Sequence, residues 1–196
     1  MMRFEPLVIQ GAARVCIDAH TDERGWFARI FCEREFGEQA RPFDLVQASL
    51  SFNARAGTVR GLHFQWPPSR EGKLVRCVRG RLVDVMLDLR PESASYLQHL
   101  SLPLDAESGD ALYLPSGVAH GFQTLADATE ILYMMDDYYA PALQAGLRWN
   151  DPAFGIRWPL TQIILSERDR ALPLFERSGF ERELQRRRAM PPAGTP

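Results

Sequence analysis

The chain has 196 residues, of which 45% are hydrophobic and 10% aromatic, and its formal net charge is -2. This length and apolar content suit one domain with a sizeable core, and we expect a single domain over residues 1–196, with residues 176–196 as a polar C-terminal extension. Because binding to a nucleic-acid backbone demands clustered basic residues, the slightly acidic balance argues against a nucleic-acid polymer as a partner. No stretch approaches the roughly 18 apolar residues of a membrane-spanning helix, so no membrane partner is expected.

The cysteines and the N-terminus point to a reducing compartment. Cys16, Cys32 and Cys77 are odd in number and widely spaced, and none belongs to a CxxC pair. Neither a disulfide framework nor a zinc site is therefore indicated. The N-terminus carries Arg3 and Glu5 beside a short apolar run, which is too short and too charged for a signal sequence. We expect a cytoplasmic protein.

The N-terminal part reads as an extended lead-in, a polar turn at residues 22–25 and a short helix at residues 33–39. From Phe43 onward, short apolar runs are separated by glycines and prolines, which predicts many short strands. The runs are residues 45–46, 58–59, 73–78, 81–89, 96–104, 111–114 and 130–135. Many short strands at regular spacing indicate an all-β sandwich or barrel.

Residues 80–89 show how such a strand divides its side chains between two faces. Alternation puts Asp84 and Asp88 on one face and Val85, Leu87 and Leu89 on the other. After residue 159 the composition favours helix, with a start at Ser166 and a charged run over residues 181–188.

Cationic side chains gather on the predicted strands. Arg60 and His63 lie in the segment RGLHFQ at residues 60–65, and Lys73 lies ten residues further on. Taken singly, each has a plain structural role as a core histidine or a solvated strand residue. Three cationic groups on adjoining strands would repel one another without an anionic ligand between them. Together they indicate a binding site for an anionic substrate.

Residues 109–120 match the pattern GxxxxxPxGxxH and end on His120. The pattern resembles the second motif of the cupin superfamily, which implies a cupin-type jelly roll. Most cupins bind a metal through an HxH pair, but residues 63–65 read HFQ, with Gln65 where the second histidine would stand. Nearby lysine and arginine charges oppose a divalent cation, so no metal is expected.

The whole run of motifs resembles the dTDP-4-dehydrorhamnose 3,5-epimerase family, from about residue 4 to residue 175. The motifs lie at residues 22–27, 60–65, 73–75, 84–90, 119–122, 149–152 and 156–159. The resemblance implies epimerisation, without a cofactor, of a nucleotide-linked 4-keto-6-deoxy sugar. The C4 ketone acidifies the protons on C3 and C5, a base removes one, cations hold the enolate and an acid returns a proton to the opposite face.

The resemblance also implies catalytic roles. His63 would be the base, Asp169 the carboxylate that orients it, and Tyr133 the acid. Lys73 and His120 would stabilise the enolate oxygen. A neutral histidine is available as a base at pH 7, and a phenol still holds its proton there.

For the nucleotide, the resemblance implies a further set of binding residues. Arg60 would pair with the diphosphate, and Tyr139, or alternatively Tyr138, would stack on the base. The other implied binding residues are Arg24, Phe27, Gln47 and Arg168.

Four positions depart from the family's usual residues. The family usually has glutamate at Arg29, asparagine at Ser49, glutamine at Glu71 and glutamate at Gln144. Arg29, Ser49 and Gln144 fall where the family helps to hold the nucleotide, so they count among the candidate binding residues. A donor-only arginine cannot replace an acceptor-only glutamate, which leaves dTDP, GDP and CDP sugars open.

Two alternatives stand beside a 3,5-epimerase. One is a 3- or 5-epimerase of a GDP- or CDP-4-keto sugar, and the other is a non-catalytic cupin that binds a sugar nucleotide. Family members are homodimers in which N-terminal strands cross to the partner, and the apolar run at residues 7–9 is compatible with such pairing. We expect a homodimer.

Overall fold

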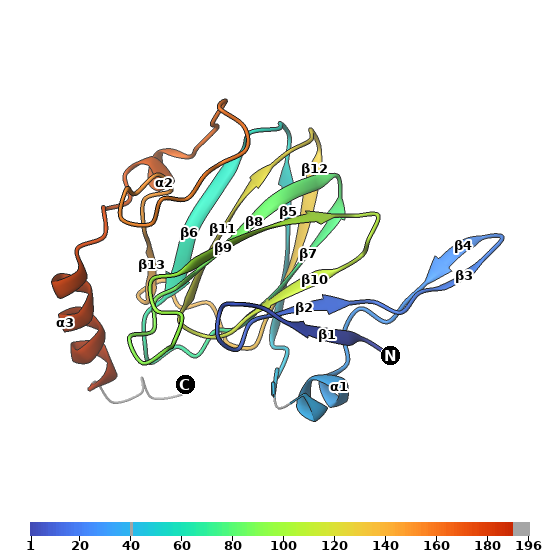
Figure 1. Cartoon of the computed structure of the whole chain (residues 1–196), viewed down its shortest axis with the longest axis horizontal. Helices are drawn as coiled ribbons and strands as arrows, with labels where there is room; N and C mark the ends of the chain where they lie inside the picture. The colour runs from blue at the N-terminus through green and yellow to red at the C-terminus, as the bar shows by residue number, and fades with distance from the viewer. Residues whose placement is uncertain (40, 190–196) are drawn as a thin grey trace.

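A computed structural model describes residues 1–39 and 41–189. Most of these residues form two antiparallel sheets that pack face to face (Figure 1). The six-stranded sheet has the order β1 (Arg3–Pro6), β2 (Ala13–Cys16), β10 (Ala111–Leu114), β7 (Lys73–Arg79), β12 (Thr129–Met135) and β5 (Gln47–Asn53). The five-stranded sheet has the order β13 (Gln144–Gly146), β6 (Val59–Gln65), β11 (Val118–Thr124), β8 (Arg81–Asp88) and β9 (His99–Asp105). The predicted all-β, cupin-type jelly roll is confirmed.

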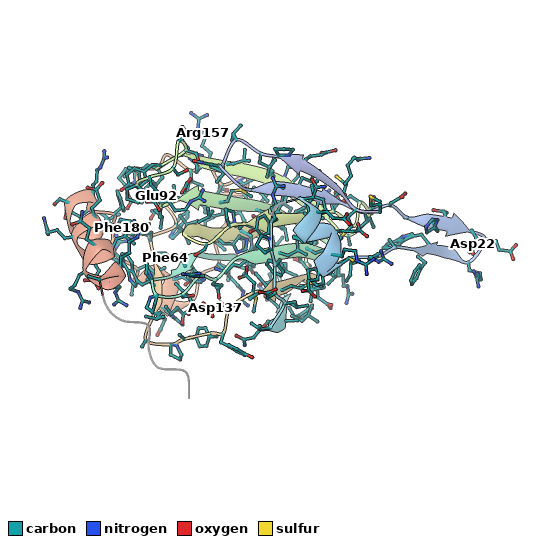
Figure 2. The ribbon with its side chains drawn as sticks, turned by 90° about the horizontal axis from the view of Figure 1, so that it is seen from below. Asp22, Phe64, Glu92, Asp137, Arg157 and Phe180 are labelled. Atoms are coloured by element: carbon teal, nitrogen blue, oxygen red, sulfur yellow. The ribbon has the colours of Figure 1, made fainter. Side chains whose placement is uncertain are left out.

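The remaining elements lie around this sandwich. A hairpin of β3 (His20–Asp22) and β4 (Gly25–Phe27) projects from its body, and Asp22 lies at the far tip (Figures 1 and 2). The helices are α1 (Glu33–Glu38), α2 (Glu167–Arg170) and α3 (Arg177–Arg188). The predicted first helix is thus confirmed to within one residue at its end. No helix within residues 1–39 and 41–189 is long and apolar enough to cross a membrane.

Two predicted strand boundaries were wrong. The apolar pair at residues 45–46 precedes β5, which begins at Gln47. The run predicted from residue 96 enters β9 only at His99, because Leu97 has a left-handed φ of 63° that no strand adopts. Ser93 and Ser95 just before it donate to the buried Asp88 carboxylate, which fixes a turn there.

The main core lies between the two sheets. Val75 and Ile131 of the six-stranded sheet meet Met86 and Phe122 of the five-stranded sheet in one buried cluster. On β8, Asp84 and Asp88 share the inward-facing register with Met86, as the alternation predicts. The opposite face of β8 is also buried, so both faces of this strand are closed to solvent.

The C-terminal segment covers the outer face of the five-stranded sheet. Phe180 and Leu184 of α3 pack in a cluster with Phe64, and the rings of Phe64 and Phe180 lie 6.1 Å apart (Figure 2). Burying one such side chain stabilises the fold by about 1.5–3 kcal/mol. The described part of the predicted polar extension therefore contributes to the core, and residues 190–196 of that extension lie outside the described residues.

Part of the outer face of the six-stranded sheet stays uncovered. Phe36 and Phe43 pack over Leu74 on one half of that face. On the other half, Leu50 and Phe52 of β5 are 62% and 56% exposed. Two large apolar side chains exposed side by side on an edge strand are typical of an interaction surface.

Candidate active site

A cavity of about 200 Å³ opens between the two sheets. One wall comes from β6 and β11 of the five-stranded sheet, and the other comes from β5, β7 and β12 of the six-stranded sheet. Its lining residues are Ser49, Arg60, His63, Phe64, Gln65, Glu71, Lys73, His120, Phe122, Tyr133, Met135, Tyr139 and Gln144. The structure therefore brings the predicted cationic cluster and the predicted acid into one space.

His63 on β6 is joined to Asp169 on α2. The His63 Nε2 and Asp169 Oδ1 atoms are 2.6 Å apart, and the Asp169 side chain is only 6% exposed. Ser166 caps this short helix, since its hydroxyl accepts a hydrogen bond from the Asp169 backbone N–H. Burial opposes ionisation of Asp169, but the hydrogen bond and charge of His63 hold its pKa below the ordinary value.

A second histidine on the same wall, His120, is also paired with a carboxylate. His120 Nε2 lies 2.6 Å from Asp84 Oδ2, and both side chains are almost fully buried. Sequence reasoning gave Asp84 no role in the site. A signal existed, because Asp84 alternates with Leu82 and Met86 on an apolar face, and a buried carboxylate needs a partner.

Tyr133 faces these histidines from the opposite sheet. Its ring lies 5.9 Å from that of His120 in an edge-to-face arrangement. Burial, and after it the negative charge of Asp84, raise the pKa of Tyr133 above its ordinary value. The phenol therefore holds its proton at neutral pH.

The cations at the cavity have partners within the chain. Lys73 Nζ lies 2.9 Å from Glu71 Oε1, and these side chains are 14% and 9% exposed. Arg60 Nε donates to Asn53 Oδ1 over 2.8 Å. The mutual repulsion inferred from the sequence is thus partly offset by the Glu71 carboxylate, which the sequence analysis did not assign to Lys73.

The cavity mouth carries other predicted binding residues. Ser49, Tyr139 and Gln144 line it. The Tyr139 hydroxyl donates to Gln144 Oε1, and the Tyr139 backbone N–H donates to Gln47 Oε1. Gln47 therefore supports the wall through Tyr139, and Tyr138 projects into solvent with 69% exposure.

Besides Gln47, four predicted binding residues do not line this cavity. Arg24 and Phe27 belong to the projecting hairpin, where Arg24 pairs with Asp22. Arg29 Nη1 lies 2.8 Å from Glu35 Oε1, which holds the guanidinium against α1. Arg168 is exposed on α2, beside the buried Asp169.

The donor set is poorly suited to a metal ion. Within residues 1–39 and 41–189, no group of three or more His, Cys, Asp and Glu side chains could hold one. Each cavity histidine already has one nitrogen on a carboxylate, and Lys73 and Arg60 place positive charge beside them. What the arrangement offers is a base, an acid and cationic donors around a small space.

Comparisons with known proteins show the family to which the chain belongs. A family model described as dTDP-4-dehydrorhamnose 3,5-epimerase matches residues 6–177. A protein of that name from Sinorhizobium fredii is 43% identical over 88% of this chain and 89% of its own. A dTDP-4-dehydrorhamnose 3-epimerase from Streptomyces niveus is 39% identical over 89% of this chain and 85% of its own.

A solved structure is similar throughout the sandwich. It is the dTDP-4-dehydrorhamnose 3,5-epimerase of Bacillus anthracis with TDP and PPi bound. It superposes with a TM-score of 0.87 at 35% identity, over 89% of this chain and all of that one. The match to the family model and the identity to the relatives extend over most of the chain. The chain belongs to the dTDP-4-dehydrorhamnose 3,5-epimerase family.

Proposed function

We propose that this protein is an isomerase that epimerises a dTDP-linked 4-keto-6-deoxy sugar at C3 and C5, without a cofactor. One observation carries the proposal: His63, which is paired with Asp169, and Tyr133 line one cavity from opposite sheets. A sugar ring held between the sheets would meet a base on one face and an acid on the other. Removal of a proton from one face and delivery to the other inverts the carbon.

The base is His63. A carboxylate only accepts hydrogen bonds, so His63 Nε2 carries the hydrogen that points at Asp169 and Nδ1 keeps a free lone pair. Nδ1 takes the proton from C3 or C5, and the electron pair of the broken C–H bond moves toward the C4 oxygen. Asp169 orients the ring and stabilises the imidazolium that forms.

The enolate oxygen is held by cationic donors. The Lys73 ammonium directs one donor at Glu71 and a second at the His63 backbone carbonyl, which leaves its third donor for the enolate oxygen. His120 donates from Nδ1 when protonated, and the buried Asp84 carboxylate balances that positive charge. Donors fixed before the reaction stabilise the developing charge without reorganising.

Tyr133 returns the proton. Its raised pKa keeps the phenol protonated at neutral pH, as an enolate-protonating acid requires. After the step, the His63 imidazolium releases its proton and the Tyr133 phenolate takes one up, so the enzyme regains its starting state with no redox change.

Arg60 binds the diphosphate, and Tyr139 stacks on the thymine at the cavity mouth. The projecting hairpin supports a homodimer, in which Arg24, Phe27 and Arg29 reach the partner's cavity. Arg168 lies at the rim as a further binding residue. Three free cysteines are compatible with a reducing cytoplasm.

A second candidate is epimerisation at C3 alone. The relative from Streptomyces niveus, named as a 3-epimerase, supports it at an identity close to that of the 3,5-epimerase relatives. The two candidates differ in whether the C5 proton exchanges.

The deciding experiment incubates the protein with dTDP-4-keto-6-deoxyglucose in D₂O. Mass spectrometry should show two deuterium atoms taken up by the wild type, or one for a C3 epimerase. His63→Ala should take up none above the uncatalysed rate. Wild-type exchange in His63→Ala would overturn the assignment of the base, and absence of exchange in the wild type would overturn the proposed function.

A further inference from the structure

Gln65 occupies the place of the second histidine in the cupin HxH pattern, and here it makes three hydrogen bonds. Its Nε2 donates to Glu71 Oε2 over 2.9 Å and to the Tyr138 carbonyl over 3.3 Å. Its Oε1 accepts from the Ala140 backbone N–H over 2.9 Å. The side chain is 9% exposed, so these bonds form away from competing water.

One of these bonds leads to the reacting end of the cavity. Gln65 holds one oxygen of Glu71, and the other oxygen of Glu71 holds the Lys73 ammonium 2.9 Å away. Gln65 belongs to the five-stranded sheet, whereas Lys73 opens β7 of the six-stranded sheet. The chain Gln65–Glu71–Lys73 therefore ties the two cavity walls together.

The other two bonds lead to the mouth. They fix the backbone on both sides of Tyr139, whose own N–H and hydroxyl bond to Gln47 and Gln144. Gln47 lies on β5 of the six-stranded sheet, and Gln144 lies on β13 of the five-stranded sheet. Because Gln65 holds the backbone on either side of Tyr139, loss of the two Gln65 hydrogen bonds would allow the Tyr139 ring to move.

We propose that Gln65 is a positioning residue that fixes the Lys73 ammonium relative to the Tyr139 ring. It acts on Lys73 through Glu71, and on Tyr139 through the backbone on either side of that residue. A position that holds a metal ligand in other cupins holds here the link between the reacting end and the nucleotide end. The proposal rests on the proposed function, because it assigns Lys73 to the enolate oxygen and Tyr139 to the base.

The test uses a charge swap. Gln65→Glu keeps the shape and the acceptor for Ala140 but removes both donors and places a second carboxylate beside Glu71. We expect kcat for deuterium exchange to fall on the order of tenfold and the Kd for dTDP to rise several-fold. The double variant Gln65→Glu/Glu71→Gln has the wild-type net charge and restores a donor–acceptor pair between the two positions. It should recover kcat to within about threefold of the wild type.

A second measurement separates positioning from general destabilisation. In a Lys73→Met background, Gln65→Glu should change kcat less than about twofold but should still raise the Kd for dTDP. The effect on kcat depends on the bond to Glu71, whereas the effect on Kd depends on the bonds to the backbone beside Tyr139. Equal kcat losses in both backgrounds, wild-type behaviour of Gln65→Glu, or a swap no better than the single variant would overturn the proposal.

The outcomes also separate this proposal from the proposed function. If the wild type exchanges deuterium and the Gln65 variants behave as the wild type, the positioning role alone is refuted. If the wild type exchanges none, the proposed function is refuted and the positioning role with it. If Gln65→Glu does not fold, the double variant Gln65→Glu/Glu71→Gln decides. An active double variant supports the link between Gln65 and Lys73, and a double variant that is folded but inactive refutes it.

Discussion

Replacing Asp169 with asparagine tests the carboxylate that stands behind the base. The substitution keeps the shape of the side chain and the Ser166 cap on its backbone N–H, but it removes the negative charge 2.6 Å from His63 Nε2. An asparagine amide can also turn its NH₂ toward the ring, which puts the hydrogen on Nδ1 and the lone pair on the wrong nitrogen. Both effects lower the rate of proton abstraction.

The size of the loss follows from the distance and the exposure. Opposite charges with centres near 4 Å apart interact by about 1 kcal/mol in water and about 4 kcal/mol near a protein surface. The His63 side chain is 32% exposed and that of Asp169 is 6% exposed, so the pair lies between these limits. Since 1.36 kcal/mol is tenfold in rate, kcat should fall about 5- to 1,000-fold.

The assay is deuterium uptake into the sugar, followed at saturating substrate. Glu167→Gln is the matched control, since Glu167 is an exposed neighbour on the same helix and should stay within about twofold of the wild type. Binding of dTDP should be unchanged in Asp169→Asn, because the carboxylate acts on the base. A wild-type kcat in that variant would refute the reasoning.

Tyr133, the uncovered sheet face at β5 and the nucleotide-binding end of the cavity give further expected outcomes. Tyr133→Phe should impair exchange and inversion at C5 while leaving some exchange at C3, as NMR would show; full C5 turnover would remove Tyr133 as the acid. Because the fold raises the pKa of Tyr133, the phenol ionises in the unfolded chain near pH 10, before it ionises in the folded protein. The stabilisation of the folded state that the neutral phenol contributes below pH 10 is therefore lost as the pH rises. By urea unfolding, the wild type should lose about 1.4 kcal/mol more than Tyr133→Phe between pH 9 and pH 11, and equal losses would contradict this. Leu50→Asp on the uncovered face of β5 should shift a dimer toward monomer in sedimentation, whereas Leu174→Asp, a half-exposed control, should not. In thermal shifts, dTDP should stabilise the protein more than GDP or CDP at equal concentration, and the reverse order would move the substrate to another nucleotide.

Local patterns were sufficient to predict the fold class. The short alternating runs and the glycine and proline breaks reflect rules that act over a few residues, and they predicted an all-β sandwich or barrel. The cupin-type jelly roll was implied by the resemblance of the motif that ends on His120. Alternation on β8 also put Asp84 and Asp88 on the same face, without indicating that this face points into the sandwich. Boundaries were less certain, as β9 shows, because the left-handed Leu97 depends on a turn closed by Asp88.

The partners inside the cavity could not be predicted in the same way. The contact of Asp84 with His120 depends on the pairing of β8 with β11. The contact of Lys73 with Glu71 depends on the path of the loop that precedes β7. Such contacts depend on strand register and side-chain direction, which a single sequence does not specify. Two of the three hydrogen bonds of Gln65 join segments more than 70 residues apart, so its linking role became visible only in the fold.

The stereochemistry of the deuterated product tests the central claim most directly, namely that base and acid act from opposite walls of one cavity. The wild type would be incubated with dTDP-4-keto-6-deoxyglucose in D₂O, and the configuration at C3 and C5 of the product would be identified by ¹³C NMR against reference sugar nucleotides. We predict deuterium at C3 and C5 with both centres inverted. Deuterium incorporated with retained configuration would mean that one group removes and returns the proton on a single face, which would contradict the account.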